Sequence, residues 1–173
     1  MTEHFRGDPD KATLAQAKDW LRARVRKGAP CPCCNQFAMV YERSITGAMA
    51  VALVPIERYF RTNTDWLHAP TYLTANSPVG VTIRGGDYAK LVHWGLLEEK
   101  PEVRDDGCPR AGFYKITPAG VEFALGRSRV PRHVAIYNQQ PVASRKPFET
   151  VSIHDVLSKV KFKNFNYEEL MGK

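Results

Sequence analysis

The chain has 173 residues, 43% of them hydrophobic, and its 25 basic and 18 acidic side chains leave a net charge of +7. This length and composition predict one domain, or one domain with an appendage, that can bury a proper core. No apolar run approaches the roughly 20 residues of a membrane-spanning helix, and the first residues lack the apolar segment of a signal peptide, so we expect a cytoplasmic protein with no membrane partner. The basic balance favours polyanions, because bound lysine and arginine release the counterions of phosphates.

Residues 1–45 are predicted to form a basic helix followed by a cysteine-rich knuckle, with a strand over 37–44. Asp8 is a suitable N-cap with Pro9 at the first helical position, and Gly28 ends the helix. The apolar residues of this helix recur at helical spacing, namely Leu14, Ala17, Leu21 and Val25. Its C-terminal half is basic, which suits either phosphate contacts or a solvated surface whose cations complement the helix dipole.

The knuckle holds three of the four cysteines. Cys31 and Cys34 form a C-P-x-C step, the spacing at which a tight turn lets two thiolates reach one tetrahedral zinc ion. A full site needs a second pair, and the candidates are Cys33, Cys108 and five scattered histidines. The sequence therefore predicts bound zinc, with Cys31, Cys34, Cys33 and Cys108 as the metal ligands. Reduced structural thiols or a relic of a zinc site are the alternatives, and a redox role is less favoured because no βαβ unit surrounds the motif.

Residues 46–126 are predicted to form the core of an α+β fold. Thr46 can cap a long helix, although that helix contains Pro55. Proline removes one backbone hydrogen bond and should kink the helix, so a strand over 48–54 is the competing interpretation. A short helix is expected over 70–74, inside a loop.

A helix, a hairpin and a second helix are predicted over 83–126. The first helix ends at Gly95, which fits a left-handed C-cap, and a strand follows directly. Residues 105–107, two aspartates and a glycine, signal the turn of the hairpin. The return strand leads to Thr117, which can cap the next helix with Pro118 at its first position.

The order of these elements and two short motifs resemble the winged-helix domains of MarR-like and PadR-like regulators. The motifs are Gly95-Leu96-Leu97-Glu98 and Tyr114-Lys115-Ile116-Thr117-Pro118-Ala119-Gly120. The resemblance implies a winged helix-turn-helix that binds double-stranded DNA with a recognition helix in the major groove. It implies DNA contacts around that helix and on the wing at Thr82, Arg84, Lys90, Arg104, Arg110 and Lys115. Asp87 and the aspartates at the wing tip depart from this pattern, because they would face phosphate.

Residues 127–173 are predicted to form a basic β-arm and a C-terminal helix. No acidic residue occurs between positions 123 and 148. Residues 132–137 alternate like a strand, 141–147 are expected as a loop, and 148–153 as a second strand that pairs back. The arm is a further candidate for nucleic-acid contacts, through Arg127, Arg129 and Arg132.

The end of the chain is aromatic. A short helix is expected to begin at Ser152 or Asp155, and Phe162, Phe165 and Tyr167 follow it. Such a segment either docks on the core or holds a partner chain.

No catalytic motif is recognised, so an enzyme is not expected. The leading hypothesis is a DNA-binding winged-helix protein, either a transcriptional regulator or a DNA-associated protein of the kind found in phages and mobile elements. The alternative is a winged helix that binds protein, through Trp94 or the aromatic C-terminal segment, as a small effector or inhibitor of a host or phage enzyme would. A structural or RNA-associated basic protein is a third possibility. The terminal helices look short, which favours a monomer over a dimer.

Overall fold

The computed structural model describes residues 12–76, 86–101, 112–158 and 166–172, and within these ranges the fold is α+β with small antiparallel sheets. The chain divides into two compact units. Unit 1 comprises Met1–Arg43 and Ala135–Lys146, and unit 2 comprises Ser44–Val134 and Pro147–Lys173. The predicted segments 1–45, 46–126 and 127–173 are continuous in sequence, whereas each unit joins two separate stretches of the chain.

Unit 1 begins with the basic helix. Its elements are α1 (Leu14–Arg24), β1 (Ala29–Pro30), β2 (Phe37–Ala38), most of β3 (Tyr41–Ser44), most of β8 (His133–Tyr137) and β9 (Gln140–Val142). Thr13 has extended backbone and forms a capping box with Gln16, so α1 begins at Leu14. The predicted N-cap Asp8 lies outside the described residues. Leu14 was expected on the buried face of the helix and is instead exposed, because it occupies the first position of α1.

Two strand predictions in this part of the chain are corrected. The single strand predicted over 37–44 is two strands, β2 and β3, and β2 pairs with β1 as a short hairpin around the cysteines. The loop predicted over 141–147 begins inside β9, which pairs with β8. The turn between those strands is Asn138-Gln139, with φ values of 49° and 60°. Two successive left-handed residues make a type I′ turn, which matches the twist of a hairpin.

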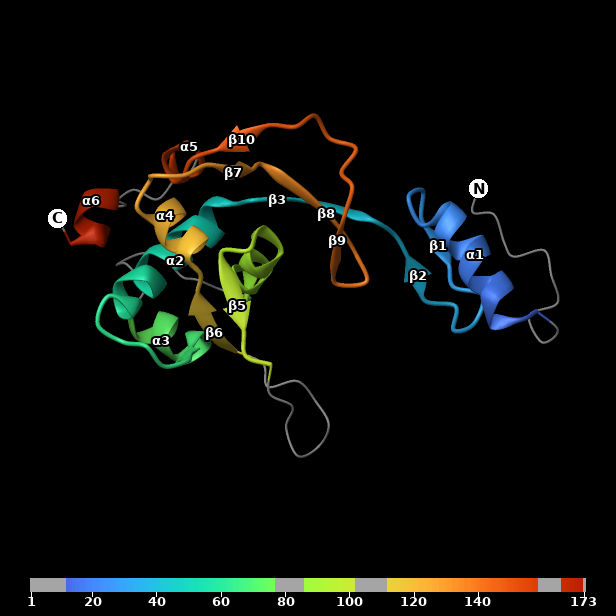
Figure 1. Cartoon of the computed structure of the whole chain (residues 1–173), viewed down its shortest axis with the longest axis horizontal. Coiled ribbons are helices and arrows are strands. Elements are labelled where there is room, and N and C mark those ends of the chain that lie inside the picture. The colour runs from blue at the N-terminus through green and yellow to red at the C-terminus, as the bar shows by residue number, and fades with distance from the viewer. Residues whose placement is uncertain (1–11, 77–85, 102–111, 159–165, 173) are drawn as a thin grey trace. The chain divides into compact units, whose positions relative to one another are not determined.

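Unit 2 is built around one buried helix (Figure 1). Helix α2 (Gly47–Phe60) is capped by Thr46, as predicted, and every residue from Met49 to Glu57 is buried. The competing strand over 48–54 is therefore wrong. An apolar run buried on all sides satisfies its backbone groups within a helix, and that helix continues through Pro55.

Around α2 the chain places two α-helices, one 3₁₀ helix and a three-stranded sheet. In chain order these are β4 (Leu67–His68), α3 (Ala69–Asn76), the 3₁₀ helix η1 (Asp87–Trp94), β5 (Leu97–Glu99), β6 (Phe113–Ile116) and α4 (Pro118–Ala124). The sheet order is β4-β6-β5, with both pairs antiparallel. Strand β4 was not predicted, because two residues carry no readable alternation. The helix predicted before Gly95 is confirmed as helical, but as a 3₁₀ helix.

The two sequence motifs that resemble winged-helix domains, one beginning at Gly95 and one containing Thr117, contact each other. Gly95 has φ of 68° and ends η1, as predicted. The Thr117 hydroxyl donates to the Gly95 carbonyl at 2.6 Å and accepts from the Gly120 N–H at 2.9 Å. Thr117 thus caps α4 and fastens it to the end of η1.

The C-terminal part of unit 2 returns to the same core. Strand β10 (Thr150–Val151) pairs with β7 (Val130–Pro131), so the predicted return strand is present but its partner is β7 and not the strand over 132–137. Helix α5 (Ile153–Leu157) is capped by Ser152, one of the two predicted starting residues, and α6 is Tyr167–Met171. None of the helices in the described ranges is long and apolar enough to cross a membrane.

Candidate nucleic-acid interface and thiol turn

Several predicted site residues lie outside the described part of the chain. These are Thr82, Arg84, Arg104, Arg110 and Cys108. The remaining predicted cations all lie in described parts of unit 2, and they are Lys90, Lys115, Arg127, Arg129 and Arg132.

The two cations predicted on the recognition helix and wing are engaged by neighbouring side chains. The Lys90 ammonium forms an ion pair with Asp87, one turn earlier in η1. Asp87, which was expected to face phosphate, is therefore partly neutralised by a lysine from the same helix. The Lys115 ammonium lies 5.1 Å from the centre of the Trp66 ring, a cation–π contact.

The three predicted arginines of the β-arm are also engaged within unit 2. Arg127 lies 3.5 Å from Glu122. Arg129 contacts Asp155 at 3.0 Å and donates to the Thr150 carbonyl at 2.9 Å, which ties α5 and β10 to β7. The Arg132 Nε atom lies 2.6 Å from a carboxylate oxygen of Glu149, an ion pair between the residue after β7 and the residue before β10.

Charge is distributed unequally between the two units. In the described part of unit 1, residues 12–43 and 135–146, eight side chains are basic and two are acidic, a net charge of +6. In the described part of unit 2, eight are basic and ten are acidic, a net charge of −2. The basic balance of the described chain therefore belongs to unit 1. Its basic residues are Lys18, Arg22, Arg24, Arg26, Lys27, Arg43, Arg145 and Lys146.

A pocket of about 250 Å³ lies among these cations. It is lined by Arg26, Val40, Glu42, Arg145 and Lys146. The Arg26 guanidinium donates to the Ala143 carbonyl at 3.1 Å, and Glu42 accepts from the Ser144 hydroxyl at 2.7 Å and the Arg145 N–H at 2.9 Å. These bonds hold the segment after β9 against β3 and the end of α1. The sequence signal for this site was the stretch without acidic residues, but the pairing of β3 with β8 that brings it to Arg26 was not predicted.

Unit 1 also exposes apolar side chains. Leu14, Phe37 and Tyr41 are the large hydrophobic residues exposed there. The Arg43 guanidinium lies over the Tyr41 ring at 5.0 Å, and that of Arg24 lies over Trp20 at 4.6 Å. Guanidinium groups over the exposed Tyr41 ring and the half-buried Trp20 ring offer a surface that suits phosphates and aromatic bases alike.

The three clustered cysteines occupy the turn of the β1–β2 hairpin. The Cys31 N–H donates to the Gln36 carbonyl at 2.8 Å, and the Asn35 N–H donates to the Cys31 carbonyl at 2.9 Å. Backbone N–H groups of Cys33 and Cys34 donate to the Cys31 sulfur, and these bonds hold the pKa of the Cys31 thiol below its usual value. The side chains of Cys33 and Cys34 lie close to that sulfur as well. Across the described ranges no group of three or more His, Cys, Asp or Glu side chains is arranged to hold a metal ion.

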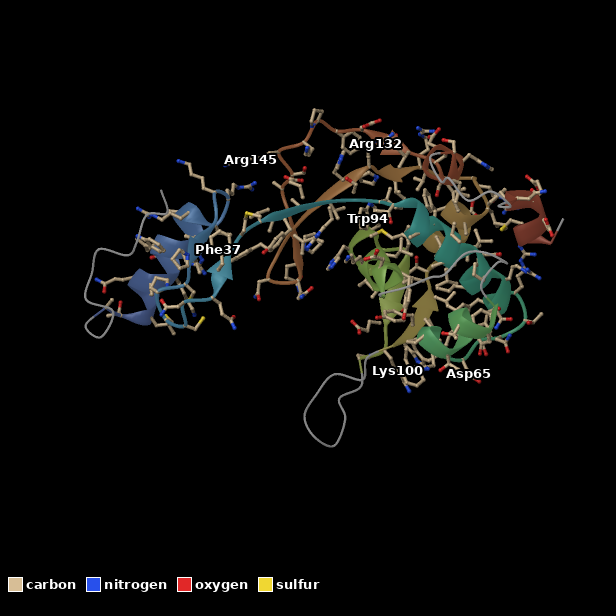
Figure 2. All side chains as sticks on the ribbon, turned by 180° about the vertical axis from the view of Figure 1, so that it is seen from behind. Phe37, Asp65, Trp94, Lys100, Arg132 and Arg145 are labelled. Atoms are coloured by element: carbon tan, nitrogen blue, oxygen red, sulfur yellow. The ribbon has the colours of Figure 1, made fainter. Side chains whose placement is uncertain are left out.

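Those described residues that were predicted to bind a protein partner make contacts within unit 2. Trp94 donates its ring N–H to the carbonyl of Pro131 in β7 at 2.7 Å, and Arg132 directly follows that strand (Figure 2). The Tyr167 hydroxyl donates to the Ala124 carbonyl at 2.6 Å, and Met171 is fully buried. Of the two alternatives for the aromatic C-terminal segment, docking on the core describes Tyr167 and Met171, whereas Phe162 and Phe165 lie outside the described residues.

Comparison with protein-family models, with curated proteins and with solved structures found no match.

Proposed function

We propose that this protein binds double-stranded DNA and that unit 1 supplies most of the phosphate contacts. The observation that carries the proposal is the segregation of charge, +6 in the described part of unit 1 against −2 in that of unit 2. Affinity for a phosphate backbone grows with the number of cations that release counterions from it, so a concentrated basic surface is more effective than a dispersed one.

The basic surface has two parts. Helix α1 offers Lys18 and Arg22, and Lys27 lies just beyond its end. The pocket beside Arg26 adds the arginine and lysine at 145 and 146. A concave site with three cations suits one phosphate group, and the exposed cations of the helix suit its neighbours along the backbone.

We further propose that the elements from α2 to α4 form a winged helix, with η1 as its recognition helix. The order helix, strand, helix, helix, strand, strand, helix supports this, as does the sheet order β4-β6-β5 with the first strand beside the last. In this arrangement η1 reads a groove while unit 1 holds the phosphates.

The test is the salt dependence of binding to a fluorescent 30-base-pair duplex, measured by anisotropy. The variant Lys18→Gln with Lys27→Gln removes two charges from unit 1. The matched control, Lys115→Gln with Arg127→Gln, removes two charges from unit 2. Each lost phosphate contact lowers the slope of log affinity against log salt by about 0.9, so the first variant should lose close to two units of slope and the control much less.

Two results would contradict this assignment. If both double variants lose the same slope, the charge of unit 1 has no special role. If the wild-type chain shows no salt-dependent binding to the duplex, DNA is not its partner.

A second candidate function is protein binding by unit 2. It is favoured by the net negative charge of the described part of that unit and by the engagement of all five of its predicted DNA-binding cations by neighbouring groups. The variant Arg84→Ala with Lys90→Ala separates the candidates. If the recognition helix contacts the bases in a groove, this variant should bind duplex DNA more weakly than wild type. An unchanged affinity would instead favour protein binding by unit 2.

A further inference from the structure

The thiol turn, residues 31–36 between β1 and β2 of unit 1, is held by backbone hydrogen bonds, which require no metal ion. The pairing of Pro30 with Phe37 closes the hairpin, and two backbone hydrogen bonds close the turn inside it. Asn35 takes the left-handed conformation, with φ of 58°, that returns the chain to β2. Since asparagine tolerates this conformation better than most residues, the local sequence fits the turn.

The turn presents a chelating pair of sulfurs. Cys31 and Cys34 are three residues apart, and the hydrogen bond from the Asn35 N–H to the Cys31 carbonyl closes the turn in which the cysteines lie close together. Cys33 lies between the two and has Lys18 as a charged neighbour. The donor set is therefore soft and suits zinc.

One turn does not complete a zinc site. A structural zinc ion takes four ligands in a tetrahedron. Among the described residues, the neighbouring Cys33 included, no group of three or more His, Cys, Asp or Glu side chains is arranged to hold a metal ion. Cys34 is exposed at the tip of the hairpin, so its sulfur is open to ligands from outside the chain. The Phe37 side chain, 54% exposed directly after the turn, gives the same tip an apolar contact surface.

We propose that one zinc ion joins two copies of this chain, with Cys31 and Cys34 of each copy as its four ligands. A two-fold axis through the ion supplies the second pair of ligands, and identical surfaces of the two copies then meet around it. Four thiolates around one Zn²⁺ carry excess negative charge. This charge offsets the repulsion between the basic unit 1 of one copy and that of the other. The zinc ligands are not among the residues assigned to DNA binding, so this proposal can be tested independently of the proposed function.

The experiment uses the full chain, purified under reducing conditions without chelator. Zinc is measured by inductively coupled plasma mass spectrometry, and mass by light scattering after size exclusion. We expect one zinc per two chains and the mass of a dimer. Removal of zinc with a chelator should give a monomer, and added zinc should restore the dimer.

Variants in the turn identify the ligands. Cys31→Ser and Cys34→Ser should each be zinc-free monomers, whereas Cys33→Ser, a matched change in the same turn, should remain a zinc-bound dimer. Because a serine variant can lose the turn itself, Co²⁺ is also titrated into the chelated wild-type chain. Its thiolate charge-transfer absorption should saturate at one ion per two chains.

Three outcomes would overturn the proposal. A monomer with one zinc per chain that is lost in Cys108→Ser would place the site within a single chain. A dimer that survives chelation would be held by other contacts. A wild-type chain that contains no zinc and binds no Co²⁺ through thiolates would leave these cysteines as structural thiols.

Discussion

Gly120 shows how one residue sets the distance between a helix and a strand. A β-carbon placed there would lie 2.1 Å from the Leu96 carbonyl oxygen and 2.8 Å from a side-chain carbon of Ile116. The first of these atoms belongs to the backbone and cannot turn aside. Glycine is therefore required by the close approach of α4 to Leu96, even though the residue lies inside a helix, where alanine is intrinsically better.

We predict that Gly120→Ala destabilises unit 2 by about 2 kcal/mol or more, because the added methyl group forces α4 away from the sheet. Urea unfolding followed by circular dichroism measures the change. Ala119→Ser, at the exposed neighbouring position, should change stability by less than about 0.5 kcal/mol. Equal stability of Gly120→Ala and wild type would show that α4 packs less closely than described.

Tyr114 links stability to alkaline pH. Its side chain in β6 is 4% exposed and meets Tyr88 edge to face. Burial, with a smaller contribution from Glu99, raises the pKa of Tyr114 from 10.0 to about 12. A phenol with a raised pKa in the folded state binds its proton more tightly there than in the unfolded state. Its stabilising effect is complete below pH 10 and is lost as the pH rises from 10 to 12.

We predict that wild-type unit 2 loses about 2–3 kcal/mol of stability between pH 10 and pH 12 through this residue alone. Tyr114→Phe should keep most of that stability, so the difference between variant and wild type should grow with pH. Denaturant unfolding at a series of pH values measures it, with the exposed Tyr41→Phe as control. Parallel pH profiles for wild type and Tyr114→Phe would contradict the burial of this hydroxyl.

At the scale of elements, the β8–β9 hairpin depends on a two-residue turn that lacks the glycine usual at its second position. Asn138 and Gln139 are both left-handed, and asparagine is common at the first of these positions, but glycine is preferred at the second. Glutamine pays a steric penalty there because its β-carbon crowds the following carbonyl.

We predict that Gln139→Gly stabilises this hairpin by about 1 kcal/mol. Hydrogen exchange of the amides in β8 and β9 should slow by about fivefold. Gln140→Gly, one residue further and inside β9, should instead speed exchange, because glycine weakens a strand interior. Slower exchange in both variants, or in neither, would argue against a type I′ turn at these positions.

At the scale of the whole molecule, the chain end is fastened to the central helix. Glu57 of α2 is 4% exposed and accepts three hydrogen bonds from Arg61, at 2.8 to 3.1 Å. The same guanidinium donates to the Met171 carbonyl in α6 at 3.1 Å. One side chain thus neutralises a buried carboxylate and holds the last helix in place.

We predict that Arg61→Ala destabilises unit 2 by about 2 kcal/mol, because Glu57 keeps its burial and loses its partner. It should also expose the C-terminal segment to limited proteolysis, read out by mass spectrometry of the fragments. Adding Glu57→Met removes the unpaired carboxylate, so the double variant should recover stability while its C-terminus stays sensitive. Loss of stability without new cleavage near α6 would mean that Arg61 does not hold that helix.

The distribution of charge also belongs to this scale. The net charge of +7 suggested a polyanion partner, and the resemblance to winged-helix regulators placed the contacts on the helix and wing. The structure surrounds the described cations of that region with acidic and aromatic side chains and concentrates positive charge in unit 1. A net charge counts residues, but a binding surface depends on which of them lie together.

The sequence by itself determined the features whose causes are local. Thr46, Thr117 and Ser152 cap their helices, and Gly95 ends η1, because each bond joins residues three or four positions apart. Capping and left-handed preference act within a single turn, so the residue types suffice to predict them.

Only the tertiary structure decided which distant segments pair. Strand β10 pairs with β7, and β8 joins β3 and β9, although alternation alone allowed the simpler hairpin. The same folding brought Arg145 and Lys146 to Arg26, gave those predicted cations that the structure describes their partners, and placed Tyr167 against Ala124. The physical reason is that alternation defines the two faces of a strand and not its neighbour, which is chosen by the burial that all segments achieve together.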